Sequence, residues 1–90
     1  MSDGPITADE VRTIRFSRPP VGKRGYREGD VDALVQRILD RLDGTGTLTS
    51  QQVREARFNK PDLFKRGYAE DEVDEFLDRV VSTLERMGRR

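Results

Sequence analysis

Apolar residues recur at helical spacing in two long segments of the chain. Their spacing is 4-3-4-3 in residues 70–87 and 4-3-4 in residues 28–43. This alternation is typical of a coiled-coil seam, in which one stripe of a helix packs against a partner helix. The pattern therefore predicts two long amphipathic helices that pair in a short coiled-coil-like fashion. The expected pairing residues are Val31, Val35, Ile38, Leu42, Val73, Leu77, Val80, Leu84 and Met87.

The apolar stripe of each long helix is wider than a strict two-position seam. It is broadened by Leu34 and Leu39 in the first helix and by Phe76 and Val81 in the second. A wide stripe indicates contact with more than one neighbouring element. We interpret the seam residues mainly as core, with an exposed groove for a partner as the alternative.

Two shorter helices are predicted upstream of the long ones. Thr7 followed by Glu10 forms a capping box, because each side chain can bond a backbone N–H that the first helical turn leaves unpaired. Thr49 and Gln52 repeat the pattern. Two turns of helix are not stable alone in water, so each must dock on another element. The expected ranges are 8–15 and 50–57.

A loop containing proline and ending in Lys-Arg-Gly-Tyr joins each short helix to the following long one. Proline disfavours helix at the residue before it, so these segments are expected to be extended or turned. Gly25 and Gly67 allow a positive φ just before Tyr26 and Tyr68, whose rings are expected to anchor the loops.

A shift of 42 positions aligns residues 6–44 with residues 48–86. The alignment has no gap and gives 15 identities in 39 pairs. We interpret this as an internal duplication. The prediction is a single all-α domain, 1–90, built of two tandem helix-loop-helix repeats, 6–44 and 48–86.

The joint between the repeats limits how the long helices can pair. The five residues 44–48 span at most ~17 Å, whereas a helix of about 16 residues is ~24 Å long. A fully parallel intrachain pair is therefore expected to be strained. We expect an antiparallel pair within the chain or pairing between chains.

Composition restricts the chemistry that the chain can perform. It contains no Cys and no His among its 90 residues, which removes thiolate ligands and the commonest general base. The acids at the start of each long helix suit the helix dipole and form a poor cage for a cation. No catalytic, cofactor-binding or metal site is expected, and no small-molecule substrate.

Charge is sorted into blocks although the formal net charge is zero. Residues 11–27 hold six basic residues and no acid, whereas residues 69–85 hold seven acids and one base. Basic, aromatic-containing loops suit phosphate groups, but overall neutrality and the lack of a recognisable reading helix argue against nucleic acid. No apolar run is long enough for a signal peptide or a membrane span, which favours a cytoplasmic location. The first four residues and Arg86, Arg89 and Arg90 are expected to be frayed ends.

The order of these motifs resembles the N-terminal domain of DivIVA-type cell-division and polarity proteins. The most specific part is Glu72-Val-Asp-Glu-Phe-Leu-Asp78, followed by Phe16 to Tyr26 with its Pro-Pro loop, which is closest to the actinobacterial version. The resemblance implies a non-enzymatic, usually dimeric adaptor at the inner face of the cell membrane that recruits protein partners. It also implies that loop-tip residues contact lipid: Val21, Lys23, Arg24, Leu63, Phe64, Lys65 and Arg66.

Three departures from the family pattern bear on these expectations. The family usually has Asp or Asn after the Tyr as a helix cap, where this chain has Arg27 and Ala69. The first tip, Val21-Gly22, offers little apolar surface to a membrane. The long coiled-coil tail of the family is expected to be absent here. The competing hypothesis is a purely structural, membrane-blind dimerisation domain in which Val21, Leu63 and Phe64 fold inward.

Overall fold

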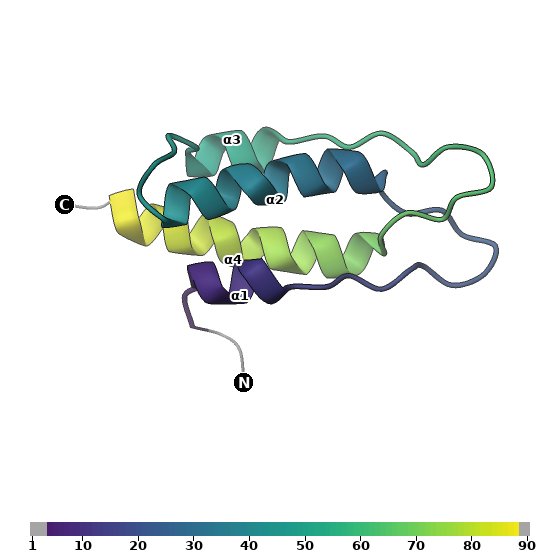
Figure 1. Cartoon of the computed structure of the whole chain (residues 1–90), viewed down its shortest axis with the longest axis horizontal. Helices are drawn as coiled ribbons and strands as arrows, with labels where there is room; N and C mark the ends of the chain where they lie inside the picture. Colours follow the sequence, from purple (N-terminus) through teal and green to yellow (C-terminus); the bar gives the residue numbers. More distant parts are fainter. Residues whose placement is uncertain (1–3, 89–90) are drawn as a thin grey trace.

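The computed structural model describes residues 4–88 and contains four helices in a short-long-short-long order (Figure 1). They are α1 (Ala8–Thr13), α2 (Glu28–Leu42), α3 (Ser50–Glu55) and α4 (Glu70–Gly88). No strand occurs within residues 4–88, so the predicted all-α class is confirmed. The expected frayed ends fall largely on residues 1–3 and 89–90, which lie outside the described range, whereas Arg86 is part of α4.

Both short helices begin at the predicted capping boxes. The Glu10 backbone N–H donates to Thr7 Oγ1 at 3.2 Å, and the Gln52 N–H donates to Thr49 Oγ1 at 3.1 Å. The N3 side chains bond back to the cap in both cases. Each helix ends two residues earlier than predicted. The reason is that the backbone is already extended at Ile14 and at Ala56, both with ψ 141°.

The two long helices run in the same direction (Figure 1). Both start near the crossing of the loops, where Tyr26 bonds to Asp74 and Tyr68 bonds to Asp32. The prediction of an antiparallel pair within the chain is therefore wrong, whereas pairing between chains stays a prediction. The short reach of residues 44–48 limits the distance from α2 to α3, and not the distance from α2 to α4.

The joint connects α2 to α3 rather than α2 to α4. Thr45 and Gly46 donate backbone hydrogen bonds to Asp40 O at 2.9 and 3.1 Å, which folds the joint over the end of α2. Leu48 O then accepts a bond from Arg41 Nε at 3.1 Å. Because α3 and the following loop carry the chain back to the crossing, the short joint causes no strain.

The core lies between the helices and draws on all four of them. Val31, Ile38, Val73 and Val80 are almost completely inaccessible, at 0–1%. Burying side chains of this size contributes about 1.5–3 kcal/mol each. The residues of the main apolar cluster are Ile6, Val11, Leu34, Ile38, Leu48, Val53, Phe76, Val80 and Leu84.

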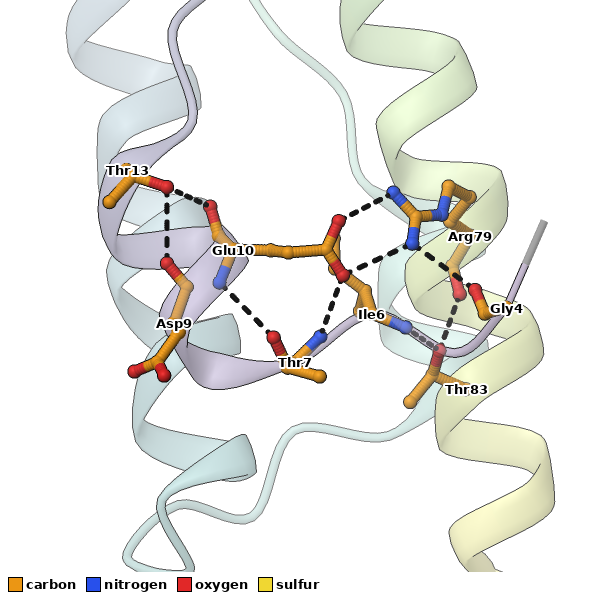
Figure 2. Close-up of polar contacts among 8 residues, drawn as sticks. All are labelled: Gly4, Ile6, Thr7, Asp9, Glu10, Thr13, Arg79 and Thr83. Carbon is orange, nitrogen blue, oxygen red and sulfur yellow. Dashed lines mark hydrogen bonds and ion pairs between the residues drawn. The ribbon is translucent and has the colours of Figure 1, made fainter. Parts of the chain in front are cut away.

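The segment before α1 is fastened to α4 by a polar cluster (Figure 2). The Ile6 N–H donates to Thr83 Oγ1 at 2.9 Å, and Arg79 donates to both carboxylate oxygens of Glu10 at 3.1 and 3.2 Å and to Gly4 O at 3.1 Å. The hydrogen bond from Arg79 holds the pKa of Glu10 below its ordinary value. The cluster therefore joins the start of the chain to its last helix.

Candidate functional site

The two loops cross each other at their C-terminal ends, just before α2 and α4 (Figure 1). Tyr26 and Tyr68 form an isolated antiparallel bridge, in which each backbone N–H donates to the other residue's carbonyl oxygen at 2.9 Å. Gly25 N–H adds a 2.8 Å bond to Arg66 O. Each loop therefore supplies the backbone partners that the other loop lacks.

Further bonds around the crossing occur in pairs whose members lie 42 residues apart. Backbone N–H groups reach the carbonyl oxygen of the opposite loop, and acids in the first turn of each long helix accept from the opposite loop. The distances range from 2.7 to 2.9 Å. The bonds are Arg27 N to Asn59 O, Ala69 N to Ser17 O, Ser17 N to Glu72 Oε1 and Asn59 N to Asp30 Oδ2.

The start of α2 lacks an ordinary side-chain cap, and hydrogen bonds from the opposite loop stabilise it instead. Arg27 at the cap position makes no capping bond, as its side chain has no short acceptor to offer. Asp30 accepts instead from the Asn59 N–H and from Arg27 Nη1 at 3.0 Å. These bonds, first that from Asn59, lower the pKa of Asp30.

The two tyrosine hydroxyls extend the crossing to the long helices. Tyr26 donates to Asp74 Oδ1 at 2.7 Å, and Tyr68 donates to Asp32 Oδ1 at 2.8 Å. Burial, together with the bonded carboxylate, raises the pKa of each tyrosine to about 12. The hydroxyls thus stay protonated as donors through the neutral range.

The tyrosine rings pack on the aromatic residue that opens the opposite loop. The centroid of Phe16 lies 5.3 Å from that of Tyr68 and 5.4 Å from that of Phe76, the latter in an edge-to-face arrangement. Tyr26 and Phe58 are 4.9 Å apart. Such pairs contribute about 0.5–1.5 kcal/mol beyond their burial. The prediction that the tyrosines anchor the loops by their rings agrees with these contacts.

The two loop glycines serve the crossing in different ways. A Cβ at Gly25 would overlap the backbone oxygen of Tyr68, although Gly25 does not have a positive φ. Gly67 has φ +75°, and its Cβ would overlap the backbone oxygen of Tyr26. The expected need for a positive φ therefore holds at Gly67, whereas close backbone approach explains Gly25.

The middle of each loop forms a turn, the loop tip, that points away from the helices (Figure 1). In the first, Lys23 N–H donates to Pro20 O at 3.0 Å and Gly22 takes φ +90°. A positive φ at the third residue of such a turn suits glycine. Val21 is 88% exposed at this tip.

The second tip places a phenylalanine where the first has glycine. Lys65 N–H donates to Asp62 O at 3.0 Å, and Phe64 takes φ +73°. A bulky residue in this region is strained by about 1–3 kcal/mol. Phe64 is 97% exposed and Leu63 is 74% exposed, so neither folds inward as the membrane-blind hypothesis expected.

The basic residues assigned to lipid contact fall into two groups. Lys23 and Lys65 are exposed at the turns. Arg66 donates to Pro19 O at 2.6 Å, and Arg24 bonds to Pro61 O in the same way. The arginines therefore tie one loop to the other, a role that the sequence interpretation missed although both are identical across the 42-residue spacing.

The expected helix-pairing residues differ in their exposure. The buried ones are Val31, Ile38, Val73, Val80 and Leu84; Val35, Leu42 and Leu77 are half-buried; Met87 is 37% exposed. The pairing role itself stays a prediction.

None of the helices within residues 4–88 combines the length and apolar character needed to cross a bilayer. In the same range no three acidic side chains are grouped closely enough to hold a metal ion.

Comparison with known proteins gives a partial match. No family model and no solved structure matches the chain. The cell wall synthesis protein Wag31 of Mycobacterium tuberculosis is 51% identical in an alignment of 41 residues that covers 42% of this chain and 16% of Wag31. The proteins of the same name from Mycolicibacterium smegmatis and Mycobacterium leprae are 51% identical over 41 residues and 45% identical over 38 residues.

The chain thus spans only about a sixth of the length of these relatives. Wag31 is a DivIVA-family protein, so the match supports the resemblance seen in the motifs. About 42% of the chain is therefore homologous to a DivIVA-family cell wall synthesis protein.

Proposed function

We propose that the chain is a non-enzymatic DivIVA-like adaptor in bacterial cell division, polarity or cell-wall growth. It acts at the inner face of the cell membrane, and its partners are other proteins, including further copies of itself. The similarity to cell wall synthesis proteins supports the process. The absence of His and Cys supports a role without catalysis.

The proposal includes one domain built of two DivIVA-like copies, 6–44 and 48–86. Bonds at matched positions support it. Tyr26 to Asp74 and Tyr68 to Asp32 are one such pair, since their members lie 42 residues apart. In this interpretation one chain carries both partners of the crossed-loop unit.

The observation that carries the membrane contact is the second loop tip. Phe64 is 97% exposed and held at φ +73°, a conformation that nothing in its own packing explains. Inserting a Phe ring into the interface contributes at most about 2–3 kcal/mol, and each lysine near an anionic leaflet adds about 1 kcal/mol. The expected binding is weak for one loop and stronger when several tips act together.

The alternative is a structural interaction domain without a membrane role. It is favoured by the engagement of Arg24 and Arg66 with the opposite loop, which withdraws two expected head-group contacts. Gly22 at the first tip adds no apolar surface either.

Co-sedimentation with vesicles separates the two functions. The wild type is expected to pellet with anionic vesicles and to stay in solution with zwitterionic ones. Phe64→Ala and Lys65→Ala are each expected to weaken binding several-fold. Met87→Ala is the matched control, because Met87 is an exposed apolar residue at the end of α4 that lies away from the loop tips. A wild type that never pellets, or a Phe64→Ala protein that pellets equally well, refutes the membrane contact.

A further inference from the structure

A groove open to solvent lies between α3 and α4. Its volume is about 990 Å³, against about 440 Å³ for the matching groove between α1 and α2. The floor is apolar and consists of Ala56, Phe58, Leu77 and Val81, all half-buried. The crossing and the core therefore leave part of the wide apolar stripe of α4 open to a neighbour.

The two rims of this groove carry opposite charge. Arg54 and Arg57 lie on the α3 side, and Asp74 and Asp78 lie on the α4 side. Arg57 donates to the neighbouring Ala56 O at 3.0 Å. In the described part of the chain, neither Arg57 nor Asp78 takes part in an ion pair, and both are exposed.

Because its two rims carry opposite charge, the groove is complementary to the same groove on a second copy of the chain. In a two-fold contact the same patch is used by both partners. If the two-fold axis runs along the groove, the basic rim of one copy faces the acidic rim of the other on both sides. Arg57 of each copy then meets Asp78 of its partner, over a shared apolar floor.

We propose that the α3/α4 groove is the interface with a second copy of this chain. The proposal rests on the proposed function, which includes self-association, and assigns a surface to it. The matching groove does not offer the same contact, because Gln36 stands where the larger groove has Asp78. The smaller groove keeps Arg15 and Asp32 on opposite sides, but it lacks the acid at position 36 that would meet Arg15 of a second copy.

An axis along the groove also fixes the direction of the pair. The long helices of both copies point the same way, so all four loop tips lie at one end of the dimer. Two exposed Phe64 rings then face the same surface. Binding through several tips exceeds that of a single tip without any new contact.

The test uses two single charge reversals and their mixture. Sedimentation equilibrium on the full chain is expected to show the mass of two chains rather than 10.3 kDa. Arg57→Glu and Asp78→Arg are each expected to weaken dimerisation by roughly tenfold or more, since each places like charges across the interface. An equimolar mixture of the two variants is expected to restore the dimer, because both contacts become attractive again.

Arg15→Glu and Gln36→Arg, at the matched positions of the smaller groove, are the controls and should leave the dimer unchanged. All four substituted positions are exposed, and circular dichroism checks that the variants are folded. A monomeric wild type, a dimer insensitive to both reversals, or a mixture that stays monomeric overturns the proposal.

The assay contains no lipid and is therefore independent of the vesicle experiment. A failed dimer with intact vesicle binding removes this interface alone. An intact dimer without vesicle binding removes the membrane contact alone.

Discussion

Tyr26 and Tyr68 exchange both of their backbone hydrogen bonds, each 2.9 Å long, where the two loops cross. Because neither loop is completed by its own half of the chain, the halves are coupled at this point. We expect residues 6–44 and 48–86 to unfold in one cooperative transition, with coincident changes in helix content and in tyrosine fluorescence.

Removing one tyrosine hydroxyl should destabilise the domain moderately. Tyr26→Phe loses the bond to Asp74 and is expected to lower the free energy of unfolding by about 0.5–1.5 kcal/mol. Tyr68→Phe should behave alike, because its bond to Asp32 is equivalent. A double-mutant cycle with Asp74→Ala, followed by urea denaturation, measures the interaction. A coupling energy of zero would contradict the assigned bond.

Alkaline pH should weaken the fold through the same two groups. The pKa of each tyrosine is raised from 10.0 to about 12. Since the folded value exceeds the unfolded value, this contribution to stability is complete below pH 10 and is lost as the pH rises toward 12. Unfolding experiments across this range should show a decline that the double variant Tyr26→Phe/Tyr68→Phe reduces. An identical decline in that variant would refute the assignment.

The loop glycines are expected to resist even the smallest side chain. Gly67→Ala combines a positive φ with overlap on Tyr26 O, and Gly25→Ala overlaps Tyr68 O. Each should cost more than about 2 kcal/mol of stability or prevent folding. Gly88→Ala is the control, because its Cβ meets nothing and its φ is not positive. Thermal melting compares the three, and an unchanged Gly67→Ala protein would contradict the crossing geometry.

Replacing Phe64 by glycine should separate stability from binding. The ring is 97% exposed and stabilises no contact, whereas its φ of +73° is unfavourable. Phe64→Gly relieves the strain at some cost in backbone entropy, so we expect a gain of about 0.5–1 kcal/mol. The same variant should lose vesicle binding. A less stable Phe64→Gly protein would show that the ring supports the fold.

Local signals in the sequence predicted much of the helical structure. Thr7 and Glu10 identified the first helix start, and the apolar spacing located α2 and α4 to within one residue at each end. These features depend on residues near in sequence, whose bonds are set by helix geometry. The overestimate of the short helices arose because the change to extended backbone after Thr13 has no strong sequence marker.

Features that depend on distant residues were harder to predict. Residues 44–48 connect α2 to α3 and not to α4, so their short reach does not limit the direction of α4, and the expected antiparallel arrangement within the chain was wrong. Arg24 and Arg66 looked available for lipid contact, because the sequence does not show whether an arginine is free or bonded to the carbonyl oxygen of another loop. An exposed groove was only the alternative interpretation of the seam residues, and its position beside Leu77 could not be predicted, because the spacing of apolar residues does not show which side of a helix stays uncovered.

The polar cluster around Arg79 brings Gly4 onto α4, far from the loop tips, and Gly88 ends that helix at the same side of the molecule. Gly4 and Gly88, the first and last residues that the structure describes, therefore both lie away from the loop tips. A fluorescent protein attached next to either residue is expected to leave the loop tips uncovered in localisation experiments.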